Sequence, residues 1–241
     1  MVFIYGLLSV FVITLFIYMM LKEKSLMAFF LKGLASFSFI GFFGLIFLMR
    51  FDELPLSQIF QVLLIFDVLL GIVLILLGLI SGLIGDLFLA LRPLRPKTED
   101  HLIINAGLIA FMIGHIFYVS ALIEFGAFSW WAIGFGVVVA IMVYIFGQKM
   151  KLKLGMMTWL IVFYSFLISL FLGLTISFLF ISTVSMQSYL LIIGATLFLI
   201  SNVMIAPVYF FEVDHKLWRI FGLASYYLAQ FMIAASIYYV I

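Results

Sequence analysis

Eight long apolar segments, separated by short polar breaks, constrain the fold of this chain more than any other feature of its sequence. They lie near residues 2–21, 26–49, 64–91, 102–123, 126–146, 156–181, 188–210 and 218–240. A helix needs about 20 mostly apolar residues to cross the hydrocarbon core of a bilayer. Only helices and closed barrels satisfy every backbone hydrogen bond there. We therefore predict an all-α bundle of eight transmembrane spans, forming a single domain over residues 1–241.

Composition excludes an ordinary soluble domain. Hydrophobic residues make up 68% of the 241 residues and charged residues 9%, whereas soluble domains are about half apolar and about a quarter charged. The net charge of +2 gives no reason to expect a nucleic-acid partner. The absence of cysteine excludes disulfides and thiolate catalysis. The N-terminal segment lacks the basic region and cleavage site of a secretory signal, so we expect it to be the first span. The run from 56 to 91 is too long for one upright span, which predicts a tilted helix or an interfacial segment over 56–66.

The basic residues separate onto alternate loops. Loops after the first, third, fifth and seventh spans hold Lys22, Lys24, Arg92, Arg95, Lys97, Lys149, Lys151, Lys153, Lys216 and Arg219. Of the remaining two, Arg50 lies at the opposite side and Lys32 within a span. The positive-inside rule places the basic loops in the cytoplasm and both termini on the non-cytoplasmic side. We expect a bacterial inner membrane, or the endoplasmic reticulum if the source is eukaryotic.

Asp86 lies inside the apolar stretch "LISGLIGDLFLAL", six residues before Arg92 and so about 9 Å from the cytoplasmic end of its span. An ionised aspartate in hydrocarbon costs about 2.5–3.5 kcal/mol on insertion scales, and such residues are functional candidates. Other polar residues share its half of the membrane: Lys32, Asn105, Tyr164, Asn202, Tyr226, Tyr227 and Gln230, with His115 nearer the centre. Asp67 is expected near the opposite interface, outside the site.

Each of these residues also has a structural interpretation. Asp86 and Lys32 would form an ion pair that ties two helices, or Lys32 would extend to the headgroups. His115 would be a neutral interhelical hydrogen-bonding group, and the tyrosines and Gln230 packing residues. The histidines lack the spacing of a zinc site, so we predict no zinc site. Gly82, Gly85, Gly107 and Gly114 are expected at close helix contacts.

Five segments, in order, resemble the YhhN-like lysoplasmalogenase family. "LISGLIGDLFLAL" is similar to its Ser-x-x-Gly-Asp-x-x-Leu motif, with Ser81 one place off the usual spacing before Gly85, Asp86 and Leu89. "NAGLIAFMIGHIFYVSAL" is similar to its Gly-x-x-x-Phe-x-x-x-His-x-x-Tyr stretch, matched by Gly107, Phe111, His115 and Tyr118. "KGLASFSFI" retains Lys32 but has Gly33 where proline is common. "GATLFLISN" and "SYYLAQFMIA" resemble two further family segments. The resemblance runs from about the second span to the eighth.

The resemblance implies a hydrolase that cleaves the vinyl ether of a lysoplasmalogen to a fatty aldehyde and glycerophosphoethanolamine or -choline. It implies two membrane-embedded aspartates as acid and base, a lysophospholipid substrate, membrane lipid around the bundle, and no cofactor. The catalytic candidates are Asp86, as the essential acid, and position 202. The substrate-binding candidates are Lys32, Asn105, His115, Tyr118, Tyr164, Tyr226, Tyr227 and Gln230.

One departure affects the chemistry, because Asn202 occupies the position of the family's second aspartate. An amide cannot take up a proton at useful pH. The chain is then a silenced hydrolase, a slower one that uses Asp86 alone, or a protein diverged to lipid binding or transport. An ion-coupled transporter is the alternative from another class, although the sequence shows no inverted repeat. An intramembrane aspartyl protease is disfavoured because Leu83 interrupts the Gly-x-Gly-Asp pattern.

Overall fold

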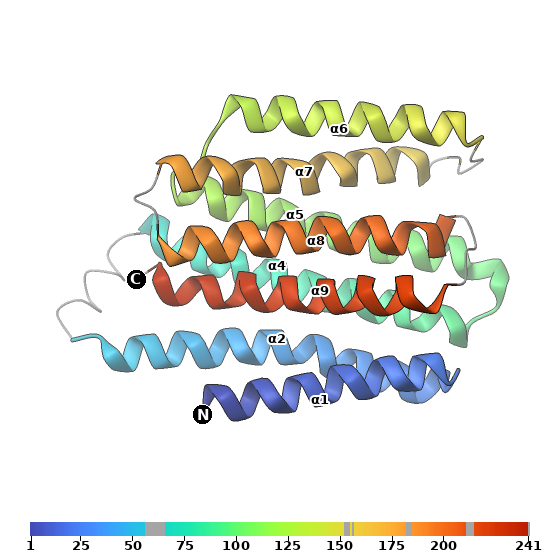
Figure 1. The fold of residues 1–241 in the computed structure, drawn as a ribbon, viewed down its shortest axis with the longest axis horizontal. Coiled ribbons are helices and arrows are strands. Elements are labelled where there is room, and N and C mark those ends of the chain that lie inside the picture. The colour runs from blue at the N-terminus through green and yellow to red at the C-terminus, as the bar shows by residue number, and fades with distance from the viewer. Residues whose placement is uncertain (56–65, 152–154, 156, 182–184, 211–214, 241) are drawn as a thin grey trace.

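The computed structural model describes residues 1–55, 66–151, 155, 157–181, 185–210 and 215–240, most of them helical (Figure 1). The α-helices are α1 (Val2–Leu21), α2 (Ser25–Glu53), α4 (Phe66–Leu91), α5 (Asp100–Glu124), α6 (Trp130–Lys149), α7 (Met157–Ile181), α8 (Met186–Phe210) and α9 (Lys216–Ser236). Short 3-10 turns are η1 (Arg92–Leu94), η2 (Lys97–Glu99) and η3 (Ile237–Tyr239). Eight helices in this part of the chain are long and apolar enough to span a membrane. The predicted all-α bundle of eight spans is confirmed, and the chain is an integral multi-pass membrane protein.

The helix ends follow local chemistry. Prolines at 93 and 96 stop α4, because proline lacks an N–H and restricts the residue before it. Gly126 adopts a φ of +86° after α5, a conformation that only glycine adopts without strain. Three bounds differ from expectation by four residues, since α2 continues to Glu53, α6 begins at Trp130 and α9 ends at Ser236, where η3 follows. The interfacial segment expected over 56–66 falls almost wholly outside the described residues.

Both termini lie at one end of the bundle, on the left of Figure 1. The described helix ends next to the α1–α2, α4–α5, α6–α7 and α8–α9 connections lie at the other end, where the basic residues gather. We call this the basic end. The positive-inside rule assigns the basic end to the cytoplasm, and that assignment stays a prediction.

The interior is formed mainly by α2, α4, α5, α7, α8 and α9. Ala35, Phe39, Leu79, Phe171 and Ile233 are among its fully buried side chains. α1 and α6 are peripheral, with few buried residues and many exposed large apolar side chains, as expected for surfaces that face lipid. α6 packs against α7 through small residues, which allow close backbone approach.

The α4–α5 contact depends on glycine, as the sequence predicted. A Cβ at Gly114 would lie 3.1 Å from the carbonyl oxygen of Gly78. A Cβ at Gly107 would lie 2.9 Å from Cδ2 of Leu89. A Cβ at Gly85 would lie 2.8 Å from Cε2 of Phe111. The two helices therefore approach more closely than any larger residue at these positions would allow.

Replacing Gly85 by alanine is expected to lower the free energy of unfolding by about 1–3 kcal/mol, because the added methyl group overpacks the contact with Phe111. Gly44→Ala is the matched control, since a Cβ there has nothing within 4 Å. Thermal unfolding in detergent measures both. Equal effects of the two substitutions would contradict the close-contact explanation.

Candidate functional site

Three donors from two neighbouring helices surround the Asp86 carboxylate of α4. Lys32 Nζ of α2 lies 3.1 Å from Oδ1. Ser36 Oγ of α2 donates to Oδ2 at 2.7 Å, and the Tyr226 hydroxyl of α9 donates to the same oxygen at 2.6 Å. Asp86 is 2% exposed and Lys32 6%. A buried ion pair persists only when hydrogen bonds satisfy its remaining atoms, and both tyrosine and serine do so here. All three groups present hydrogens to the two carboxylate oxygens of Asp86.

Ser36 was not among the site residues predicted from the sequence. It lies four residues after Lys32, so both side chains project from the same face of α2. Its hydroxyl also lies 3.5 Å from the hydroxyl of Tyr227. A search for small polar residues four positions from Lys32 would have identified Ser36. Tyr227 therefore reaches the carboxylate only through Ser36.

A cavity of about 560 Å³ opens beside Asp86. Its polar lining includes five predicted site residues: Lys32, Asp86, Tyr164, Asn202 and Tyr226. The remaining wall is mostly apolar and comes from α4 to α9. Gly147, Thr158 and Trp218, near the ends of α6, α7 and α9, place one limit of the cavity at the basic end. Its size and apolar character are those of a small-ligand site.

A one-directional chain of hydrogen bonds leads to Asp86 from deeper in the bundle. The Tyr118 hydroxyl donates to Gln230 Oε1 at 2.7 Å, and Gln230 Nε2 donates to the Tyr226 hydroxyl at 3.2 Å. Tyr226, which accepts from Gln230, donates to Asp86. Tyr118 and Gln230 were predicted to bind substrate. The structure places them behind Tyr226, outside the residues that line the large cavity.

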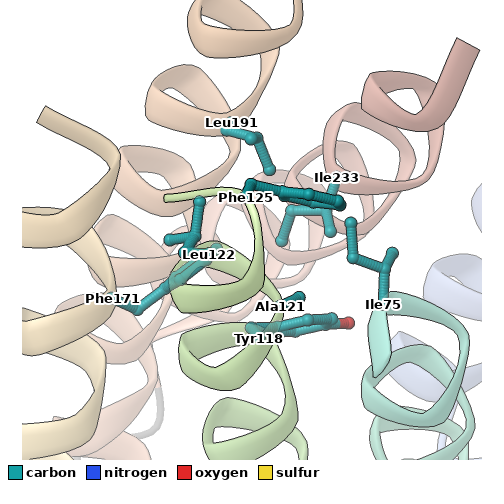
Figure 2. A pocket seen from close by; sticks show the side chains of 8 residues that line it. All are labelled: Ile75, Tyr118, Ala121, Leu122, Phe125, Phe171, Leu191 and Ile233. Atoms are coloured by element: carbon teal, nitrogen blue, oxygen red, sulfur yellow. The ribbon is translucent and has the colours of Figure 1, made fainter. Parts of the chain in front are cut away.

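The Tyr118 end of this chain of hydrogen bonds lies at a second, apolar pocket (Figure 2). Its lining side chains come from α4, α5, α7, α8 and α9 and from the residue that follows α5. They are Ile75, Tyr118, Ala121, Leu122, Phe125, Phe171, Leu191 and Ile233. This pocket has no room for a water molecule. The Tyr118 hydroxyl therefore has Gln230 rather than solvent as its acceptor.

His115 occupies an aromatic cage next to the site. Its ring lies 4.5 Å from the ring of Phe198 and 5.3 Å from that of Tyr164, both of which line the large cavity. Nδ1 lies 3.0 Å from the Phe111 carbonyl oxygen. Because a carbonyl only accepts, Nδ1 carries the hydrogen and Nε2 presents a lone pair. Nε2 is buried and has no partner among the described residues.

Asn202 and Asn105 differ in position. Asn202 lines the large cavity, donates from Nδ2 to the Phe198 carbonyl oxygen at 2.9 Å, and interacts with the Tyr164 side chain. Asn105 is not among the lining residues, and its Oδ1 is buried without a partner in the described part of the chain. Asn202 thus belongs to the cavity wall, and Asn105 is separate from it.

The site offers charge and shape rather than metal chemistry in the residues described. No group of three His, Asp or Glu side chains there could hold a metal ion. The Lys32 ammonium and the Asp86 carboxylate lie side by side on the wall of an apolar space. In such surroundings, charge interactions are stronger than in water. The arrangement suits stabilisation of a developing cation and activation of a water molecule.

Comparison with known proteins gives one match. A family model described as the YhhN family matches residues 57–237, which include Asp86, Asn202 and Tyr226; Lys32 and Ser36 precede it. No curated protein matches the chain, and no solved structure does. The matched range is most of the 241 residues, and it confirms the resemblance found in the sequence. The chain therefore belongs to the YhhN family.

Proposed function

We propose that the chain hydrolyses the vinyl ether bond of lysoplasmalogens within the membrane, releasing a fatty aldehyde and glycerophosphoethanolamine or -choline. The observation that carries the proposal is the position of Asp86. It is a carboxylate held by three donors on the wall of an apolar cavity that extends to the basic end. Family membership supports the proposal. A single-chain lipid fits such a cavity with its chain among apolar side chains and its ether bond beside the carboxylate.

The reaction begins with a proton added to the β-carbon of the vinyl ether, which leaves an oxocarbenium ion. Water then adds to the cationic carbon, and the resulting hemiacetal collapses to aldehyde and alcohol. The Asp86 carboxylate stabilises the cation and accepts a proton from the attacking water. This role differs from the essential acid expected from the sequence, because a carboxylate with three donors is already satisfied in its ionised form.

The general acid that would protonate the β-carbon is then the group that this protein lacks. Position 202 lines the same cavity and holds an amide, which cannot donate a proton at useful pH. In the proposed mechanism, water supplies the proton in its place. Loss of a positioned acid costs about 10²- to 10⁴-fold in rate. We therefore propose a slow hydrolase rather than an inert one.

The test is release of fatty aldehyde from a lysoplasmalogen by the purified protein in lipid nanodiscs. We expect aldehyde from the vinyl ether and none from the saturated alkyl ether of the same length, which cannot form the oxocarbenium ion. Empty nanodiscs give the background rate. Absence of aldehyde from both the chain and its Asn202→Asp variant would refute the proposal.

The buried Lys32–Asp86 pair on the cavity wall also suits a second function, ion-coupled transport of a lipid. In that case, movement of a labelled lysolipid between leaflets would depend on both residues and on the ion gradient. No product would form. Measurement of lysolipid movement and aldehyde release on the same preparation separates the two functions.

Tyr118→Phe is expected to lower the turnover number about 3- to 10-fold with little change in KM. Gln230 loses the donor that orients its amide, so Tyr226 loses the partner that directs its hydrogen toward Asp86. Tyr144→Phe on α6 is the matched control, because Tyr144 is exposed and is distant in sequence from the residues of the hydrogen-bond chain. A change in KM alone would instead indicate direct contact with substrate. Steady-state kinetics of aldehyde release distinguish the two results.

A further inference from the structure

Arg92 is fixed at the basic-end rim of the large cavity. It is the first residue of η1, directly after α4. Its guanidinium carbon lies 5.3 Å from the ring centre of Tyr209, and Tyr209 lines the cavity. Its Nε donates to Asp100 Oδ2 at 2.9 Å. The ring and the carboxylate therefore hold the guanidinium at the rim, where its side chain is 30% exposed.

The chemistry of Arg92 suits an anion. Asp100 engages Nε, and among the described residues no other side chain accepts a hydrogen bond from the two terminal NH2 groups of the guanidinium. A guanidinium presents its donors in a planar fork that matches the oxygens of a phosphate. Lys32, which lines the cavity, is buried against Asp86, whereas Arg92 adjoins the cavity through its contact with the lining residue Tyr209. Of the two, Arg92 is the one placed for a group that arrives from the interface.

Helix geometry relates Arg92 to Asp86. They are six residues apart along α4 and its continuation, which corresponds to an axial distance of about 9 Å. In a lysolipid, about six single bonds separate the phosphorus from the vinyl ether carbon, and at about 1.5 Å each they span roughly 7–8 Å when extended. A lysolipid with its ether bond beside Asp86 thus has its phosphate at the level of Arg92.

We infer that Arg92, held by Tyr209 and Asp100, forms a headgroup subsite that binds the phosphate of a single-chain phospholipid in the cavity. This inference rests on the proposed function for the identity of the lipid. The subsite fixes how deeply the lipid enters, because the phosphate stops at the rim while the chain continues into the apolar space. It thereby selects lysophospholipids over neutral single-chain lipids.

Binding rather than turnover tests the subsite. The probes are a saturated alkyl-ether lysophosphatidylethanolamine and the alkylglycerol of the same chain, which lacks the phosphate. Affinities are measured with the purified full chain in nanodiscs. Arg92→Gln is expected to weaken binding of the lysophospholipid about 10- to 100-fold and to leave binding of the alkylglycerol unchanged. Arg92→Lys is expected to fall between, since it keeps the charge and loses the fork.

Arg95→Gln is the matched control, because Arg95 is exposed three residues further along and makes the same charge change. Equal losses in the Arg92 and Arg95 variants would overturn the subsite in favour of general attraction by the basic end. An equal loss for both probes in Arg92→Gln would show a structural role and overturn it as well. Inorganic phosphate is expected not to displace the lysophospholipid, and displacement would assign the site to a free anion instead.

The result is independent of hydrolysis. Arg92-dependent binding in a protein that releases no aldehyde would preserve the subsite while refuting the proposed function. Aldehyde release with binding unaffected by Arg92→Gln would do the reverse.

Discussion

Asp86→Asn is expected to reduce aldehyde release to the background rate and to lower the free energy of unfolding by about 3–5 kcal/mol. The amide removes the charge that, in the proposed mechanism, stabilises the oxocarbenium ion and accepts a proton from water. It also leaves the buried Lys32 ammonium without its partner. Removing one member of a buried ion pair is strongly destabilising because the other charge remains out of water. Denaturation in detergent and the aldehyde assay measure the two effects separately.

A double variant separates structure from chemistry. In Lys32→Met/Asp86→Asn neither charge remains, so stability is expected to recover to near that of the starting protein, while aldehyde release stays at background. Asp67→Asn is the control, since Asp67 is exposed in the first turn of the same helix and its loss should change stability by less than about 0.5 kcal/mol. Full activity in the double variant would mean that the pair serves only to tie α2 to α4.

Asn202→Asp is expected to raise the rate of aldehyde release by about 10²- to 10⁴-fold, which is the usual contribution of a positioned general acid. The new carboxyl group would lie on the cavity wall beside Tyr164, without a lysine partner of the kind that Asp86 has. An apolar site favours the protonated form of such a group, which is the form an acid requires. The increase should be in the turnover number rather than in KM.

Asn202→Leu is the matched control for this gain. It is close to asparagine in size, adds no acid, and is expected to leave the rate within about threefold of the starting protein if the amide has no role in proton transfer. Combining Asn202→Asp with Asp86→Asn should return the rate to background. A folded Asn202→Asp variant that binds the lipid but shows no gain would remove the main support for the acid assignment.

The sequence predicted depth well and direction around each helix axis less well. Because a helix rises about 1.5 Å per residue, the count from Arg92 placed Asp86 at a definite level, and the structure puts Lys32 and Tyr226 against it. Which side of a helix faces the cavity depends on how neighbouring helices pack. Counting residues could not tell that Tyr118 and Gln230 lie behind Tyr226, or that Asn105 is outside the cavity lining.

The small size of the serine side chain explains why Ser36 was not predicted as a site residue. Charged and aromatic residues in an apolar segment are conspicuous, whereas a serine is common in transmembrane helices and satisfies itself with backbone carbonyls, as Ser81 does. Ser36 differs only because Asp86 lies opposite it, a fact of tertiary structure. Lys32 and Asp86 indicated in the sequence that α2 and α4 could pair. Ser36 can be identified as a second donor only once that pairing is known.

The direction of the hydrogen bonds from Tyr118 to Asp86 bears on whether the carboxylate can change its charge during a working cycle. A carrier driven by a proton gradient must stabilise its carboxyl group in both protonation states. Here Gln230 occupies the acceptor side of the Tyr226 hydroxyl, and that hydroxyl can only present its hydrogen to Asp86. A proton on the facing oxygen would meet another hydrogen, and the tyrosine could not turn away without breaking the bonds behind it. These bonds therefore hold Oδ2 of Asp86 as an acceptor, and in the proposed mechanism the proton that the carboxylate takes from water must leave again before the next turnover.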